Sequence, residues 1–199
     1  MIDPHRVRLH EAAHQLAPRL LGQPDPTHVH TLSDGSGECG ADSKPPDVAP
    51  MDMTRAEWHW YVTARGIACR AGEAALETFG YADHAEGAGW DRGLARKAAE
   101  AMDPANPASV DLWMERFYRV ALALCRDHRA ALERLADTLE ANDDYLTGDE
   151  VPRSLDAALA GTGPTPIFTG RRHISQAVFV DRLGVRTREM EAAAGKRSV

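Results

Sequence analysis

Five residues near the start of the sequence, His10-Glu11-Ala12-Ala13-His14, form an H-E-x-x-H motif. On an α-helix His10 and His14 would lie one turn apart and point the same way, so both imidazoles could bind one Zn²⁺ ion. Glu11 would lie beside them, close enough to take a proton from a water molecule on that ion without binding the ion itself. The motif therefore predicts a hydrolytic zinc site with Glu11 as the general base.

A catalytic zinc site needs a third protein ligand and a fourth position that stays open. The metzincin pattern would require Gly at position 17 and His at position 20, but the chain has Ala17 and Leu20. A carboxylate from a later helix is the alternative, and the sequence offers Glu73, Glu77 and Asp91. Spacing leaves all three open, because an acid early in a helix, such as Asp91, is also favoured there by the helix dipole.

The two histidines fall on a helix predicted over residues 5–21. Asp3 is a favourable N-cap and Pro4 suits the first helical position. Apolar residues recur at helical spacing through the segment, which places the whole motif on one continuous helix.

A small β-hairpin or edge strand is predicted near residues 27–41, where residues 27–33 alternate like a strand. Thr54 and Glu57 have the spacing of a capping box, which marks the start of a long helix. The remaining predicted elements are helices over residues 54–79, 90–102, 109–141 and 153–159 and a turn over residues 142–148. We therefore expect a mainly α (α+β) domain over residues 1–160, followed by a linker and a basic C-terminal tail over residues 161–199.

Length and composition narrow the class of protein. The chain has 199 residues and a net charge of −7, so we expect one domain with a tail and no nucleic-acid partner, which would need a basic surface. We see no stretch long and apolar enough for a membrane span, and the N-terminus lacks the apolar region of a secretory signal. Three widely spaced cysteines indicate no disulfide framework, so we expect a cytoplasmic location.

The ordered set of motifs resembles the peptidase domain of the FtsH-type ATP-dependent zinc metallopeptidases. The motif helix of that family reads H-E-A-G-H, and its next helical signature is similar to residues 69–75 (CRAGEAA). Its aspartate-bearing helix is similar to residues 91–99 (DRGLARKAA), and its C-terminal helix and turn are similar to residues 129–150. The resemblance covers about residues 5–155, and H-E-x-x-H is the one motif that is specific by itself.

The resemblance implies that His10, His14 and Asp91 bind Zn²⁺ and that Glu11 is the catalytic base. It also implies a mainly helical peptidase domain that assembles as a hexamer. Its substrate would be an unfolded protein segment lying as an added strand beside an edge strand, here around residues 36–41. Pairing through the main chain would give little sequence selectivity.

The chain also departs from that family. It begins where the peptidase domain of the family begins, so we expect no ATPase domain and no membrane anchor. Without them it would act on short or already unfolded peptides, or would depend on a separate ATP-dependent unfoldase. Ala13 stands where the family has Gly, which adds a methyl group where elements pack closely.

The predicted function is that of a zinc-dependent endopeptidase, which hydrolyses peptide bonds of unfolded or flexible protein segments with a metal-activated water. The alternative is a non-catalytic, peptidase-like binding or adaptor module that retains the zinc site. Glu11 argues against this alternative, because a structural zinc has no need of it. An esterase or amidase with the same zinc chemistry is also compatible with the sequence.

Other residues allow further hypotheses. His28 and His30 share one face of a predicted strand and could bind a second metal ion, although an exposed polar strand face is the simpler interpretation. His84 could face the zinc site and stabilise a reaction intermediate, or lie in a plain surface loop. The basic segment at residues 171–173 could contact nucleic acid or an acidic partner, but a flexible or docked basic tail is favoured.

Overall fold

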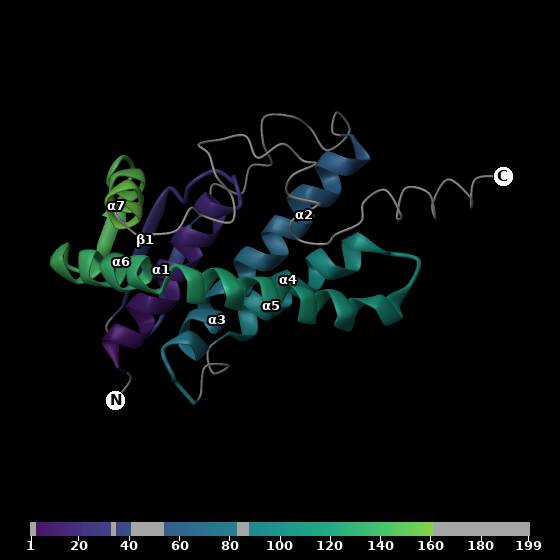
Figure 1. The fold of residues 1–199 in the computed structure, drawn as a ribbon, viewed down its shortest axis with the longest axis horizontal. Helices are drawn as coiled ribbons and strands as arrows, with labels where there is room; N and C mark the ends of the chain where they lie inside the picture. The colour runs from purple at the N-terminus through teal and green to yellow at the C-terminus, as the bar shows by residue number, and fades with distance from the viewer. Residues whose placement is uncertain (1–2, 33–34, 41–53, 83–87, 161–199) are drawn as a thin grey trace.

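The computed structural model describes residues 3–32, 35–40, 54–82 and 88–160, which are mostly helical with a small antiparallel sheet (Figure 1). This confirms the predicted mainly α (α+β) class. The predicted linker and tail, and His84, lie outside the described residues. The elements in chain order are α1 (Pro4–Leu20), β1 (His28–Thr31), β2 (Gly37–Gly40), α2 (Arg55–Cys69), α3 (Ala71–Thr78), α4 (Gly89–Met102), the 3-10 turn η2 (Pro107–Ser109), α5 (Val110–Asp127), α6 (Arg129–Ala141), β3 (Tyr145–Thr147) and α7 (Glu150–Leu159).

The predicted starts of the helices are largely confirmed. Two segments that were each predicted as one long helix are each two shorter helices. Asp3 caps α1 through the backbone N–H of His5, and Thr54 forms the expected capping box at the start of α2. The segment predicted as one helix over residues 54–79 is two helices that meet at Arg70. The segment over residues 109–141 likewise divides at His128.

In the part of the chain that the structure describes, the sheet has three strands in the order β2-β1-β3, and both pairs are antiparallel. The third strand lies within residues 142–148, where a turn was predicted, so that prediction was incomplete. Val29 of β1 pairs with Leu146 of β3, and both side chains are buried against the helices. Because side chains alternate along a strand, His28 and His30 lie on the opposite, outer face.

Helix α1 contacts α3, α6 and β1, and α6 and β1 lie beside it in Figure 1. Its residues Leu9, Ala12, Ala13 and Leu16 are buried, and the two alanines allow neighbouring elements to approach closely. The methyl group of Ala13 is thus accommodated inside the core.

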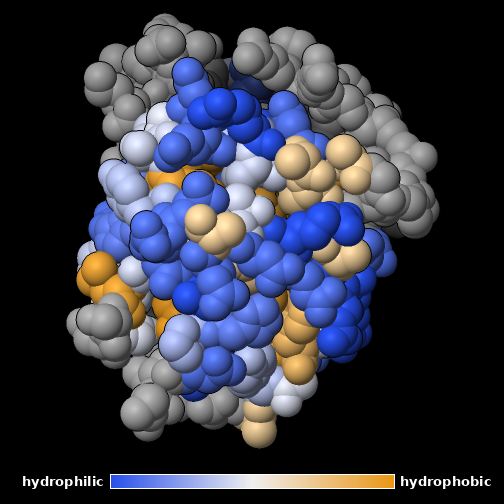
Figure 2. Space-filling view, turned by 90° about the vertical axis from the view of Figure 1, so that its left-hand side faces the viewer, coloured by the Kyte–Doolittle hydropathy of each residue, from blue (hydrophilic) through white to orange (hydrophobic). Residues whose placement is uncertain are grey.

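The face shown in Figure 2 is mostly hydrophilic, with apolar side chains in small separate groups. Among the described residues, no helix combines the length and the hydropathy needed to span a bilayer.

An ion pair joins the turn before β3 to α1. Arg8 donates to both carboxylate oxygens of Asp144, from Nε at 2.6 Å and from Nη2 at 3.1 Å. The carbonyl oxygen of Asp144 accepts a hydrogen bond from the backbone N–H of Thr31 at 3.0 Å, which ties the same turn to β1. The hydrogen bond from Arg8 holds the pKa of Asp144 below its ordinary value.

We expect this ion pair to make stability depend on pH. Because the pKa of Asp144 is lower in the folded chain than in the unfolded chain, its stabilising contribution is complete above the unfolded value and is lost as pH falls through the folded value. Asp144→Asn should therefore lower the free energy of unfolding by about 1 kcal/mol at neutral pH and by less in acid. Urea unfolding of the wild type and of Asp144→Asn, at neutral and at acidic pH, checks this prediction. An equal loss of the free energy of unfolding at the two pH values would contradict it.

Candidate metal centre

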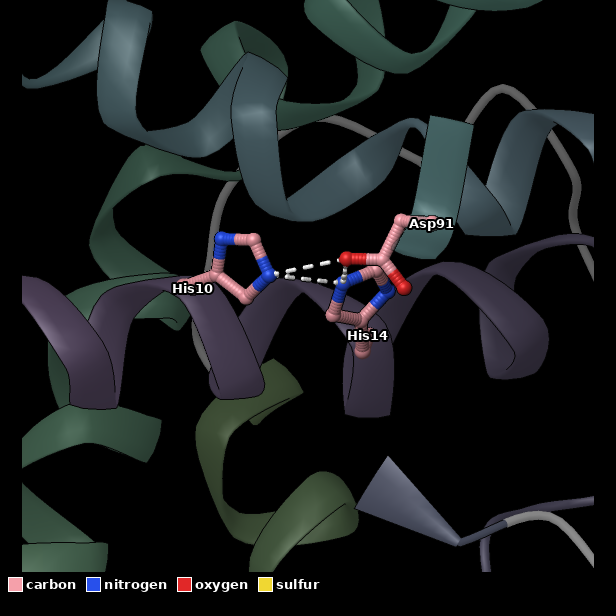
Figure 3. Close-up of side chains that lie close together, drawn as sticks. All are labelled: His10, His14 and Asp91. Carbon is pink, nitrogen blue, oxygen red and sulfur yellow. Dashed lines mark hydrogen bonds and ion pairs between the residues drawn. The ribbon is translucent and has the colours of Figure 1, made fainter. Parts of the chain in front are cut away.

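Three side chains from two helices converge at one point beside α1 (Figure 3). Nε2 of His10 lies 3.2 Å from Oδ2 of Asp91, and Nε2 of His14 lies 3.3 Å from the same oxygen. The two Nε2 atoms are 3.0 Å apart. Ligand atoms about 2.0–2.1 Å from one tetrahedral zinc ion lie about 3.3 Å from one another, so these donors have the types and spacing that suit Zn²⁺.

The local geometry of the helices explains this convergence. His10 and His14 are four residues apart on α1, so their rings lie on one face of the helix. Asp91 lies in the first turn of α4 and points down toward the two rings in Figure 3. The three side chains remain between 13% and 22% exposed, so the cluster is not closed off from solvent.

A backbone carbonyl fixes the protonation pattern of His14. Nδ1 of His14 lies 3.0 Å from the carbonyl oxygen of Ala68 at the end of α2. Because a carbonyl oxygen only accepts, Nδ1 carries a proton, and Nε2 is the nitrogen that faces His10 and Asp91. Nε2 would offer its lone pair to a metal ion once its own proton has been released. Such a hydrogen bond behind a ligating histidine is typical of metal sites.

A glycine makes the space for His10. A Cβ atom on Gly72 of α3 would lie 2.4 Å from Cε1 of the His10 ring, too close for any side chain. The absence of a side chain at Gly72 therefore lets the imidazole pack against α3 and still reach the cluster.

His14 and Asp91 stabilise each other in their charged forms. Burial opposes ionisation of His14, but the hydrogen bond and charge of Asp91 outweigh it and raise the pKa of His14 to about 9. Burial also disfavours the Asp91 carboxylate, yet hydrogen bonds from His10 and His14 hold the pKa of Asp91 well below its ordinary value. Asp91 is therefore ionised at neutral pH, the state in which a carboxylate binds a metal ion.

Glu11 is buried beside the cluster without belonging to it. Its carboxylate lies against the first residue of β2, where a Cβ atom on Gly37 would be 2.6 Å from Oε1 of Glu11. Burial raises the pKa of Glu11, and the charge of Asp91 adds to the effect, while His14 and His10 oppose it. A carboxylate with a raised pKa is a better proton acceptor, which suits a general base.

Glu73, an alternative third ligand, is engaged by two arginines. Its oxygens accept hydrogen bonds from Nη2 and Nε of Arg92 at 2.5 and 3.1 Å, and Nη2 of Arg70 lies 3.0 Å away. Since Arg92 directly follows Asp91 on α4, the buried Glu73 holds the first turn of α4 against α3. We infer that this ion pair positions Asp91.

Glu77, the other alternative, points toward α5. It accepts hydrogen bonds from the hydroxyl of Tyr118 and from Nη2 of Arg126, the latter at 3.2 Å. Of the three acids that the sequence left open, the structure thus brings Asp91, and neither Glu73 nor Glu77, to the two histidines.

Substituting Arg92 tests the positioning role. In Arg92→Met the Asp91 carboxylate is intact but the first turn of α4 loses its anchor, so we expect zinc affinity to fall about tenfold. The matched control is Arg96→Met on the same helix, where the arginine pairs with the exposed Glu100. Isothermal titration with Zn²⁺ measures the zinc affinity of both variants. A loss of thermal stability in Arg92→Met without a loss of affinity would show that the ion pair supports the fold alone.

The sequence reasoning did not identify the supporting residues Ala68, Gly72, Gly37 and Arg92. A backbone carbonyl leaves no trace in side-chain type, so nothing pointed to Ala68. The two glycines were visible, but which side chain fills the space above each depends on the packing of distant elements.

Comparison of the sequence with protein-family models and with curated proteins finds no match. The resemblance to the FtsH-type peptidases therefore remains a prediction from motifs, and function has to be argued from the site itself.

Proposed function

We propose that the chain is a zinc-dependent endopeptidase. The observation that carries the proposal is the convergence of His10, His14 and Asp91, two imidazoles and one carboxylate, with the Glu11 carboxylate beside them. This donor set matches a catalytic zinc site with three protein ligands and a position left for water or substrate.

A Zn²⁺ ion bound by these three residues would polarise the scissile carbonyl group and lower the pKa of water. Glu11 would accept the proton from the attacking water and pass it to the nitrogen of the leaving amine, because an amide nitrogen leaves only when protonated. Burial keeps this proton-accepting group away from bulk water, and contact with Gly37 holds it at the side of the cluster.

The edge of the sheet is the proposed position of an extended substrate. Among the described strands β2 is at the edge of the sheet, and its residue Gly37 contacts Glu11. A peptide added as a strand along β2 would pass close to the general base, with main-chain hydrogen bonds giving affinity. Folded domains seldom offer a free strand, so we propose unfolded or flexible protein segments as substrates. The hexamer, the separate unfoldase and the cytoplasmic location stay predictions of the sequence.

A cleavage assay with metal exchange tests the proposal. We expect the zinc-loaded chain to fragment an unfolded, casein-like protein, the chelator 1,10-phenanthroline to abolish fragmentation, and added Zn²⁺ to restore it. Cleavage that persists after the chelated metal has been dialysed away would contradict the proposal. Zinc binding without any cleavage of unfolded proteins would contradict it too, and would favour the adaptor module.

A further inference from the structure

The outer face of the sheet carries a second group of metal-ligating side chains. His28 and His30 project from β1, and Glu38 of β2 lies directly opposite His30 in the register. Nε2 of His28 is 3.6 Å from Oε1 of Glu38, and Nε2 of His30 is 3.9 Å from Oε2. These separations are too long for hydrogen bonds, but they approach the spacing of donors that share one ion.

The ring of His28 is held by its neighbours. A Cβ atom on Gly40, the cross-strand partner of His28, would lie 1.9 Å from Cε1 of the ring, so the imidazole occupies space that only glycine leaves. The hydroxyl of Thr27 donates to the carbonyl oxygen of Gly40 at 3.1 Å and lies 3.2 Å from Nδ1 of His28. Since the hydroxyl proton is used on the carbonyl, the Thr27 oxygen accepts from Nδ1–H, and the lone pair on Nε2 faces Glu38.

We propose that His28, His30 and Glu38 form a second Zn²⁺ site, separate from the cluster of His10, His14 and Asp91. Two imidazoles and a carboxylate are donors that suit Zn²⁺, with water completing the coordination. The site is more open than the first, because the side chain of Glu38 is 62% exposed, so its affinity is lower. A bound ion would join the edge strand β2 to the central strand β1. This inference stands independently of the proposed peptidase activity.

Metal stoichiometry tests the second site directly. We expect isothermal titration of the full chain with Zn²⁺ to show two binding events, the second weaker than the first. Glu38→Gln should weaken the second event about tenfold or more and leave the first unchanged, since loss of a ligand costs at least as much as loss of a supporting residue. Gly40→Ala, which displaces the His28 ring without removing a ligand, should weaken the same event.

The controls separate the two sites. His5→Gln, a histidine outside both clusters, should keep both events, and His10→Gln combined with His14→Gln should keep the second alone. A single binding event in the full chain that Glu38→Gln leaves unaltered would overturn the second site. Loss of the first site alone would count against the proposed peptidase and not against this inference.

Discussion

Replacing Glu11 with glutamine is expected to reduce kcat/KM for an unfolded protein substrate about 10²–10⁴-fold, the usual contribution of a general base. Glutamine has the same shape as glutamate, so it should fit the buried position against Gly37, but its amide cannot accept the proton. Because Glu11 lies outside the group of ligand atoms, zinc binding should remain close to that of the wild type.

The matched control is Glu133→Gln, the same chemical change at an exposed position on α6. It should leave both cleavage and zinc binding unchanged. Cleavage by Glu11→Gln at the wild-type rate would remove Glu11 from the mechanism. Loss of zinc binding in that variant would instead make Glu11 a ligand.

Asp91→Asn is expected to weaken zinc binding about 100-fold, because it removes the one negative charge among the three proposed ligands. At a zinc concentration that saturates both proteins, the variant should lose about 2.8 kcal/mol of zinc-dependent stabilisation, since each tenfold change in Kd is about 1.4 kcal/mol. Thermal unfolding with and without Zn²⁺ measures this difference for each protein.

Asp111→Asn is the matched control, because Asp111 also lies in the first turn of a helix, α5, but is exposed to solvent. Its zinc-dependent stabilisation should equal that of the wild type. If Asp91→Asn gained as much stability from zinc as the wild type, the third ligand would have to be another group, and the geometry proposed for the site would fail.

The helical character of the chain and two of the three side chains of the candidate metal site could be predicted, because both are local properties. Apolar residues at helical spacing, the Asp3 cap and the capping box at Thr54 are each contained in a few consecutive residues. The pairing of His10 with His14 follows from one turn of helix in the same way.

The division of the helix over residues 54–79 could not be predicted in this way. No Pro interrupts the pattern, the nearby Gly66 and Gly72 lie inside helices, and apolar residues continue on both sides of Arg70. Instead, contacts with distant elements accompany the break, because the guanidinium of Arg70 lies over the ring of Tyr118 at 4.8 Å. Strand β3 was missed because its three residues are too few to show an alternating pattern and it forms by pairing with β1.

The third side chain of the cluster depends on the same long-range packing. Asp91, Glu73 and Glu77 are all acids on helices, and the sequence does not show which of them faces α1. The structure separates them through their partners: arginines hold Glu73, Tyr118 and Arg126 hold Glu77, and Asp91 is left beside the histidines.

Anomalous diffraction at the zinc edge, from crystals of the chain grown with stoichiometric zinc, tests the central claim most directly. We predict one strong peak about 2.0–2.2 Å from Nε2 of His10, from Nε2 of His14 and from a carboxylate oxygen of Asp91. A zinc peak elsewhere on the chain, with none at these three side chains, would contradict the account.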